Sequence, residues 1–329
     1  MAQALSGLGV VVIGRNEGER LLRCLKSVLP FSAQVVYVDS GSRDDSVAQA
    51  QNLGVDVVAL DMAQAFTAAR ARNAGMRQLK IGLPQVACVQ FVDGDCEIRD
   101  GWLETAWQFL QQRADVVAVC GRRRERFPER SIYNLMCDVE WNTPAGKAKA
   151  CGGDAMMRVS AFEAVSGFRD DLIAGEEPEL CVRLRANGGV VWRLDTEMTW
   201  HDAAILRFSS WWRRTARGGY AFAEGTLLHG APPERHWVQE TRRIWLWGML
   251  IPVLTGVLTA LFGGWMLSGL LLYPVQAVRL GWRNRQRGLP QPWRMGGLMV
   301  IGKFAELTGA LTFYYRRLLR QRGRLIEYK

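Results

Sequence analysis

The chain has 329 residues, enough for one large α/β domain and a smaller segment, and its charge is unevenly distributed. Residues 241–329 contain 14 Lys and Arg against 2 Asp and Glu, which leaves 28 against 30 in residues 1–240. The net charge of +10 therefore belongs to the last part of the chain, and the first part is near neutral. We place a domain boundary between residues 240 and 241 and expect no nucleic-acid partner.

All seven cysteines lie in the first part of the chain. Their number is odd, they form no Cys-x-x-Cys pair, and most of them stand within apolar runs, which is typical of reduced thiols in a cytosolic protein. Residues 1–8 carry no basic residue before an apolar run that is only as long as a strand. We therefore expect no secretory signal peptide.

Short apolar runs alternate with amphipathic stretches through the first half of the chain. We expect strands at residues 8–13, 34–38, 55–60, 86–92 and 116–120, with a further strand near 190–194. Helices are expected after the first strand up to Pro30, after the second up to about Leu53, and at residues 63–79 and 102–110. This alternation predicts a doubly wound, mostly parallel, Rossmann-like sheet.

Acidic side chains stand where two of these strands end. Asp93 and Asp95, separated by Gly94, follow the strand at 86–92, and Asp39 follows the strand at 34–38. Because ligands of open α/β sheets bind beyond the carboxyl ends of the strands, we expect one shared site. Carboxylate oxygens in such a site suit Mg²⁺ or Mn²⁺ together with a phosphorylated substrate. The alternative is a polar strand end followed by an ordinary turn.

Four segments in this order resemble the family 2 glycosyltransferases, which have the GT-A fold. These segments are Val11–Glu17, Val38–Ser46, Ala71–Gly75 and Asp93–Asp95. The resemblance continues through Gly152–Asp154, Gly167–Asp170 and Gly175–Leu180, and it covers roughly residues 8–205. Residues 241–329 lie outside the part of the family that these motifs define.

The resemblance implies a nucleoside-diphosphate sugar as donor and Mn²⁺ or Mg²⁺ as cofactor. It assigns the nucleotide sugar to Arg15, Asn16, Glu17, Asp39, Gly41, Arg72, Asn73, Asp93 and Asp154. It assigns the metal to Asp95, Asp93 and His201, although His201 could equally be a hydrogen-bonded structural residue. Arg15 departs from the family pattern, because an aromatic residue often stands there against the nucleobase; a guanidinium plane could stack in its place.

The segment Glu176-Glu177-Pro178-Glu179 opens a predicted helix and matches the position of the catalytic base in the family. Alignment places the base at Glu177, but glutamate stands where aspartate is usual, which leaves Glu176 as the alternative. Carboxylates in a first helical turn could instead simply complement the helix dipole. A single base without a nucleophile for double displacement predicts an inverting reaction.

We expect transfer of a single sugar to a lipid-linked or surface-glycan acceptor, since the Gln-x-x-Arg-Trp pattern of processive members is absent from the sequence. Residues Arg122–Arg124 could face an anionic acceptor or form a solvated loop. Two alternatives remain: a catalytically silent component that binds a nucleotide sugar within a membrane assembly, and a sugar nucleotidyltransferase.

The tail contains 35 consecutive residues without a charge, at positions 244–278. As a single helix this stretch would be roughly 52 Å long, more than a hydrocarbon core of about 30 Å. Gly263-Gly264 divides it, so we expect a hairpin of two short spans, or else one tilted span with an interfacial piece. Arginines on both flanks predict that both ends and the catalytic domain face the cytoplasm at the inner membrane.

A second tail segment, at about residues 295–319, is interrupted by Lys303 and Glu306. Its apolar stripe consists of Val300, Phe304, Leu307, Leu311, Tyr315 and Leu318. We expect an amphipathic helix that lies on the membrane and contacts lipid. The alternative is a helix packed on the protein itself.

Overall fold

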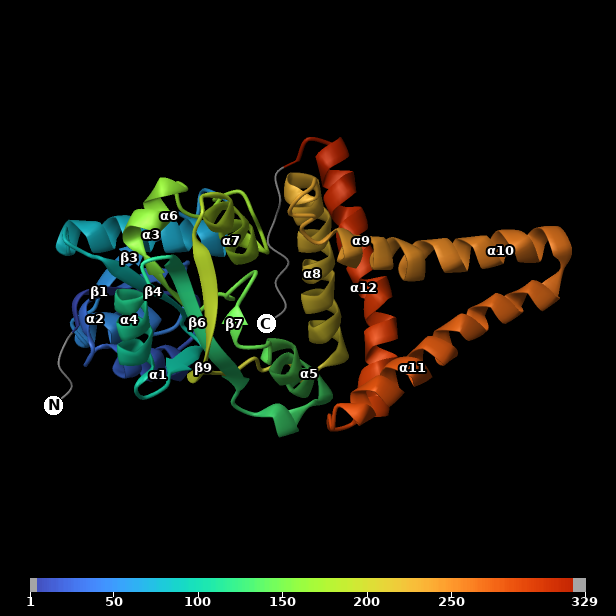
Figure 1. Cartoon of the computed structure of the whole chain (residues 1–329), viewed down its shortest axis with the longest axis horizontal. Helices are drawn as coiled ribbons and strands as arrows, with labels where there is room; N and C mark the ends of the chain where they lie inside the picture. Colours follow the sequence, from blue (N-terminus) through green and yellow to red (C-terminus); the bar gives the residue numbers. More distant parts are fainter. Residues whose placement is uncertain (1–4, 322–329) are drawn as a thin grey trace. The chain divides into compact units, whose positions relative to one another are not determined.

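The computed structural model describes residues 5–321 of the chain. It contains two compact units, Met1–Phe127 with Glu140–Ala203 and Pro128–Val139 with Ala204–Lys329 (Figure 1). The helix at Phe208–His229 belongs to the second unit, so this unit begins earlier in the chain than the basic composition of residues 241–329 indicates. The reason is that this helix, despite its mixed charge, packs on the last long helix of the chain.

The first unit is built on one mixed sheet in the order β3-β2-β1-β4-β8-β6-β9-β5, with β7 paired to β9. Its strands are β1 (Leu5–Gly14), β2 (Ser32–Asp39), β3 (Asp56–Ala59), β4 (Cys88–Asp93), β5 (Cys96–Ile98), β6 (Val116–Glu125), β7 (Gly146–Lys147), β8 (Ala155–Arg158) and β9 (Val190–His201). Strands β1 to β4 are parallel, as are β6 and β9. Strand β8 runs antiparallel between β4 and β6, and β5 and β7 run antiparallel to β9.

The helices of this unit follow the strands much as the hydrophobic pattern predicts. They are α1 (Glu19–Val28), α2 (Ser46–Asn52), α3 (Ala68–Gly82), α4 (Trp102–Gln112), α6 (Val159–Ala164) and α7 (Glu176–Ala186); α5 (Ile132–Trp141) spans the boundary of the two units. The central strands are apolar throughout because helices cover the sheet, and residues Val10–Val12 are completely buried. Gly75 has a packing role, since a Cβ there would overlap the side chain of Val11. The glycine thus lets α3 lie close on β1.

The expected α/β sheet and its first four parallel strands are confirmed, with three differences. Strand β6 continues to Glu125, so the run Arg122–Arg124 lies on a strand and not in a solvated loop. Strand β9 continues to His201, which therefore ends the strand and does not follow it. The short strands β5, β7 and β8 were not predicted, because segments of two to four residues carry little periodic signal.

The second unit is helical. It contains η1 (Pro128–Arg130), α8 (Phe208–His229), α9 (Val238–Ile244), a π-helical stretch η2 (Trp245–Leu250), α10 (Ile251–Phe262), a 3₁₀ stretch η3 (Gly264–Leu271), α11 (Leu272–Gln286) and α12 (Pro292–Leu318). Helices α8 and α12 cross at glycines: a Cβ on Gly309 would overlap the carbonyl oxygen of Ala216, and one on Gly219 would overlap that of Glu306. Their backbones are therefore in direct contact.

Helix α12 buries a face that matches its predicted apolar stripe only in part. Its buried residues are Met295, Gly296, Val300, Gly302, Ala305, Gly309, Ala310 and Phe313. From the predicted stripe, Leu311, Tyr315 and Leu318 are exposed. The helix thus packs on the protein, as in the alternative considered for it, because small residues permit a closer helix contact than the large apolar ones.

The uncharged stretch forms two arms that reverse at Gly263 (Figure 1). Gly263 has φ = +101°, a conformation that favours glycine. Within residues 5–321, one helical stretch, Val238–Phe262, is long and apolar enough to cross a membrane. Large apolar side chains along both arms are exposed, among them Val253, Val257, Leu261, Phe262, Trp265, Leu271, Val275 and Val278.

Candidate active site

Parallel pairing brings the ends of β1, β2 and β4 to one edge of the sheet. In the register of these strands Gly14 lies beside Asp39, and Ile13 lies beside Asp93. The turns after β1 and β2 are tied together by Asn16, whose N–H donates to Ser42 Oγ at 2.9 Å and whose Oδ1 accepts the N–H of Arg43 at 2.8 Å. Asn16 has φ = +55°, which asparagine tolerates better than most residues. The two predicted nucleotide-binding turns therefore form one surface.

Asp39 shapes the turn that follows β2. One carboxylate oxygen accepts the N–H groups of Gly41 at 3.0 Å and Ser42 at 2.9 Å, and the other accepts the hydroxyl of Tyr37 at 2.9 Å. Burial, together with the Asp39 carboxylate, raises the pKa of Tyr37 well above its usual range. The hydroxyl therefore stays protonated and donates to Asp39. Gly41 has φ = +82°, so the turn needs a glycine at that position.

Two arginines clamp Asp93 from opposite sides. Arg72 on α3 donates to Asp93 Oδ1 at 2.7 Å and to Glu176 Oε1 at 2.7 Å. Arg123 on β6 donates to Asp93 Oδ2 at 2.9 Å. Burial alone would raise the pKa of Asp93, but Arg72 and Arg123 outweigh it and hold this pKa well below its usual range. Asp93 is therefore ionised at neutral pH, with both oxygens paired to guanidinium groups.

Asp154 holds both Arg123 and Asp93 in position. It is completely buried, and it accepts hydrogen bonds from Arg123 Nε at 2.8 Å, Thr199 Oγ1 at 3.0 Å and the N–H of Asp93 at 3.1 Å. Its oxygens are thus used within the protein, so Asp154 orients Arg123 and Asp93. Sequence reasoning did not single out Arg123 as a member of the acid site, because a run of three arginines gave no sign of which one points inward. The strand alternation of an extended β6 would have separated it from its neighbours.

Asp95 and His201 lie side by side because β5 pairs with β9. The ladder sets Cys96 opposite His201, and His201 Nε2 lies 3.3 Å from Asp95 Oδ2. One ligand atom each from Asp95, Cys96 and His201 lies within 4.8 Å of the others. His201 Nδ1 lies 3.5 Å from Glu125 Oε2, the arrangement in which a carboxylate orients a metal-binding imidazole. Burial and then Arg123 lower the pKa of His201, which keeps the imidazole neutral, the form that binds metals.

The acidic start of α7 does more than complement a helix dipole. Glu176 pairs with Arg72, whereas the Glu177 side chain is tied to the loop before β8. Glu177 Oε1 accepts the N–H of Cys151 at 2.6 Å and the Cys181 thiol at 2.8 Å, and Oε2 accepts the N–H of Gly152 at 2.7 Å. Burial raises the pKa of Glu177, although these hydrogen bonds oppose the shift.

The loop that Glu177 holds lies against the clamped aspartate. A Cβ on Gly153 would stand 2.8 Å from Arg72 Nη2 and 2.9 Å from Asp93 Oδ2. A larger residue would therefore displace either the loop or the ion pair. Both glutamates are therefore connected to Asp93. Glu176 is connected through Arg72, and Glu177 through the backbone of residues 151–153.

Three other predicted residues have local contacts. Glu17 forms an ion pair with Arg20 at 2.8 Å, and Arg15 is half-buried where β1 ends. The Asn73 side chain donates to the carbonyl oxygen of Phe168 and to Asp170 Oδ1, each at 2.7 Å. Asn73 thus fixes the loop at residues 167–170 and does not reach the acid cluster.

The chain is similar in sequence to known proteins. Residues 9–165 match the model of the glycosyl transferase family 2. The chain is 26% identical over 226 residues to the succinoglycan biosynthesis protein ExoA of Rhizobium meliloti (strain 1021), a match that covers 65% of this chain and 68% of ExoA.

Two solved structures are similar in fold. The mannosyltransferase PcManGT from Pyrobaculum calidifontis, in complex with GDP-Man and Mn²⁺, has a TM-score of 0.63 and 19% identity over 93% of this chain and 87% of its own. Glucosyl-3-phosphoglycerate synthase from Mycobacterium tuberculosis, in complex with Mn²⁺ and UDP-glucose, has a TM-score of 0.52 and 16% identity over 69% and 80%. From its motifs, their arrangement at one sheet edge and these matches, the chain contains a glycosyltransferase family 2 segment at residues 9–165 and has a GT-A-like fold.

Proposed function

We propose that this protein transfers one sugar from a nucleoside-diphosphate sugar to an acceptor hydroxyl, with inversion at the transferred carbon. The main support is Asp93, an ionised carboxylate clamped by Arg72 and Arg123 at the sheet edge that also carries Asp39 and Asp95. The turns at residues 14–17 and 39–42 would hold the nucleoside, with the Arg15 guanidinium available to stack on the base. The two arginines would lie near the diphosphate.

A divalent cation fits this site at Asp95 and His201. Their ligand atoms adjoin, the imidazole is neutral, and Glu125 is in place to orient it. Asp93, also predicted as a ligand, is less suited because both its oxygens are paired with arginines. The complexes of the two structural relatives with Mn²⁺ support Mn²⁺, with Mg²⁺ as the alternative. Such an ion would offset the negative charge of the departing diphosphate.

Glu177 is our candidate for the general base that takes the proton of the acceptor hydroxyl. Its raised pKa makes it a better proton acceptor, whereas the charge of Glu176 is already paired with Arg72. The Glu177 oxygens accept the N–H groups of Cys151 and Gly152. Acceptor binding would exchange one of these bonds for the substrate hydroxyl.

We further propose that the acceptor is lipid-linked or a surface glycan and that the enzyme works on the cytoplasmic face of the inner membrane. Two observations support this: the exposed apolar arms that meet at Gly263, and the similarity to a succinoglycan biosynthesis protein. The arginines at 279, 283, 285 and 287 would face anionic lipid, where each contributes about 1 kcal/mol.

The test is a panel of nucleotide sugars supplied with Mn²⁺ or Mg²⁺ to the full-length protein in detergent, with nucleoside diphosphate release as the readout. We expect one donor to be hydrolysed slowly, and the Asp95→Asn variant to lose this activity. Donor binding without release by the wild type would favour a catalytically silent component. Pyrophosphate release from a nucleoside triphosphate and a sugar phosphate would favour a nucleotidyltransferase.

A further inference from the structure

Three thiols gather beside Glu177 in the first unit. Cys181 follows Glu177 by four residues on α7, a spacing that puts both side chains on one face of the helix. Cys151 lies in the loop before β8, and its N–H donates to Glu177 Oε1 at 2.6 Å. The Cys151 thiol is also hydrogen-bonded to the thiols of Cys181 and Cys120, of which Cys120 lies on β6. Segments far apart in the chain thus converge on one carboxylate.

The distances in this group are short enough for a single metal ion to bridge. One ligand atom each from Cys151, Glu177 and Cys181 lies within 4.8 Å of the others, and Cys181 Sγ is 2.8 Å from Glu177 Oε1. Around a tetrahedral Zn²⁺, with bonds of about 2.3 Å to sulfur and about 2.0 Å to oxygen, two sulfurs lie about 3.8 Å apart, and a sulfur and an oxygen about 3.5 Å apart. The contact of Cys181 with Glu177 would therefore have to lengthen by less than about 1 Å.

Burial of the group still permits an ion to enter. Glu177 and Cys181 are almost completely buried, whereas Cys151 is half-buried and gives access from solvent. When a divalent ion binds the two thiols as thiolates, both thiol protons leave to solvent. The net charge of the group then stays the same, so binding adds no unpaired charge to the interior.

The ligand atoms of this group differ from those at the proposed catalytic cation. Two thiolates and one carboxylate suit Zn²⁺, whereas Mn²⁺ and Mg²⁺ prefer oxygen ligands. The group near Asp95 and His201 shares no residue with it. The first unit therefore offers two sets of metal ligands with different chemical preferences.

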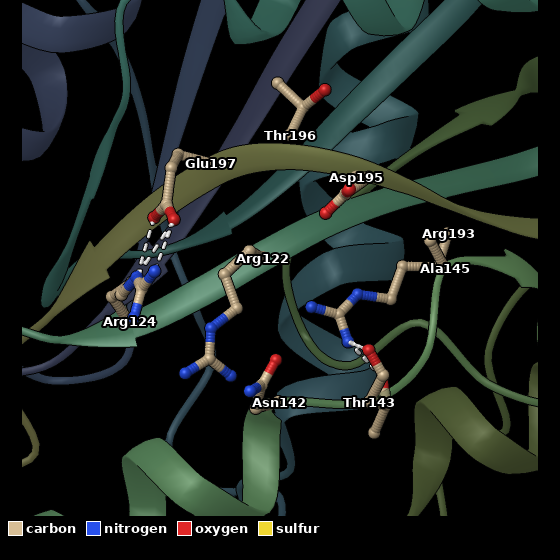
Figure 2. A pocket seen from close by; sticks show the side chains of 9 residues that line it. All are labelled: Arg122, Arg124, Asn142, Thr143, Ala145, Arg193, Asp195, Thr196 and Glu197. Carbon is tan, nitrogen blue, oxygen red and sulfur yellow. Dashed lines mark hydrogen bonds and ion pairs between the residues drawn. The ribbon is translucent and has the colours of Figure 1, made fainter.

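The cavity on β6 and β9 offers no comparable set. It has a volume of about 170 Å³, and its charged lining consists of Arg122, Arg124, Arg193, Asp195 and Glu197 (Figure 2). A guanidinium group carries only donors, and Glu197 accepts three hydrogen bonds from Arg124. None of the described residues that line it is a cysteine. A thiophilic ion would therefore bind at the thiols beside Glu177.

We propose that Cys151, Cys181 and Glu177 bind a Zn²⁺ ion at a site distinct from that of the catalytic cation, and that this ion inhibits sugar transfer. Three protein ligands leave the fourth tetrahedral position to a water molecule. The inhibition rests on the proposed function, because it takes Glu177 to be the general base. A carboxylate that ligates Zn²⁺ shares its charge with the metal and is a much weaker acceptor for the proton of the acceptor hydroxyl.

The first experiment measures Zn²⁺ binding to the full-length protein in neutral detergent, by competition with a chromophoric chelator. A phosphine reductant keeps the thiols reduced. Cys181→Ser and Cys151→Ser should each lower Zn²⁺ affinity at least about a hundredfold, since loss of a residue that only orients a ligand already costs about 10–100-fold. Co²⁺ in place of Zn²⁺ should give thiolate-to-metal charge-transfer absorption in the wild type, and both variants should weaken it. A purely structural role of the cysteines would give no such absorption.

Cys88→Ser is the matched control. Cys88 is also a completely buried cysteine, but within residues 5–321 it belongs to no group of potential metal ligands. Its substitution should leave Zn²⁺ affinity unchanged. Asp95→Asn addresses the other ligand set and should keep the tight Zn²⁺ site. If Cys181→Ser does not fold, Cys151→Ser, at a half-buried position, still decides. A wild type without charge-transfer absorption, or tight Zn²⁺ binding that Asp95→Asn removes and Cys151→Ser leaves intact, would overturn the proposal.

The second experiment measures donor hydrolysis on the same samples at saturating Mn²⁺, with and without one equivalent of Zn²⁺. Water takes the place of the acceptor hydroxyl. Zn²⁺ should slow the wild type at least about a hundredfold, the lower range for loss of a general base, and Cys151→Ser should relieve this inhibition. Equal inhibition of the wild type and Cys151→Ser would overturn the inhibitory role. Zn²⁺ binding that depends on Cys151, without turnover of any donor, would overturn the proposed sugar transfer and leave the Zn²⁺ site in place.

Discussion

Replacing Arg123 by glutamine should test the acid network most directly. The Arg123 guanidinium contacts Asp154 at 2.8 Å and Asp93 at 2.9 Å, and Asp154 is completely buried. Glutamine would leave Asp154 as a buried charge without a counterion. Removing one partner of a buried ion pair destabilises a protein by about 3–5 kcal/mol. Because Arg72 still compensates Asp93, we expect a value at the lower end, about 3 kcal/mol.

Thermal unfolding of the full-length protein in detergent provides the measurement. For a folding unit of this size, 1 kcal/mol shifts Tm by about 2–4 °C, so Arg123→Gln should lower Tm by roughly 6–12 °C. Arg124→Gln is the control on the neighbouring residue. The pair of Arg124 with Glu197 is exposed, and such pairs contribute about 1 kcal/mol or less. Asp154→Asn added to Arg123→Gln should recover part of the loss.

The dependence on pH gives the second readout. Burial raises the pKa of Asp93, but the two arginines lower it by more than burial raises it. The pKa of Asp93 in the folded state therefore lies below its value in the unfolded chain, which is about 3.9. A carboxyl of this kind adds stability above its unfolded pKa and loses it as pH falls through the folded pKa. The Tm difference between wild type and Arg123→Gln should therefore be largest near pH 7 and shrink below about pH 4. A difference under about 2 °C at pH 7, or one that grows on acidification, would refute the reasoning.

Three further predictions concern the base, the metal and the helical unit. Glu177→Gln should bind the donor normally but transfer sugar about 10²–10⁴-fold more slowly. Because burial raises the Glu177 pKa, the acid limb of the wild-type pH–rate profile should lie above the usual glutamate pKa of about 4.3. A larger loss of rate in Glu176→Gln than in Glu177→Gln would contradict the choice of Glu177 as the base. Asp95→Asn should weaken Mn²⁺ binding at least about tenfold, as measured by electron paramagnetic resonance, while Tm changes little. Unchanged Mn²⁺ affinity would exclude Asp95 as a ligand. Gly309→Leu should destabilise the second unit by about 1–3 kcal/mol or more, since the leucine side chain would overlap the backbone of α8. Gly297→Leu is the control, because a side chain at that position meets open space and should leave Tm nearly unchanged. Equal Tm values for the two variants would refute the close crossing of α8 and α12.

The sequence alone determined the α/β fold, the strands β1 to β4 and the acids at their ends. These features are local, since a buried strand is a continuous apolar run and a strand end is marked by the turn residues that follow it. The chain reverses at Gly263, and the expectation that residues 244–278 form two short membrane spans stays a prediction. The motif at residues 71–75 likewise drew attention to Arg72, which the structure places beside Asp93.

Only the tertiary structure decided which side chains meet. The clamp of Arg123 on Asp93 and Asp154, the pairing of Asp95 with His201, and the attachment of Glu177 to residues 151–152 each join segments 25 or more residues apart. Their partners depend on the antiparallel insertion of β8 between β4 and β6 and on the length of β9, which short or irregular strands do not reveal in a pattern of period two. The buried face of α12 was likewise set by the closeness of its partner α8, since backbone contact selects glycine and alanine where hydrophobic periodicity selects leucine and tyrosine.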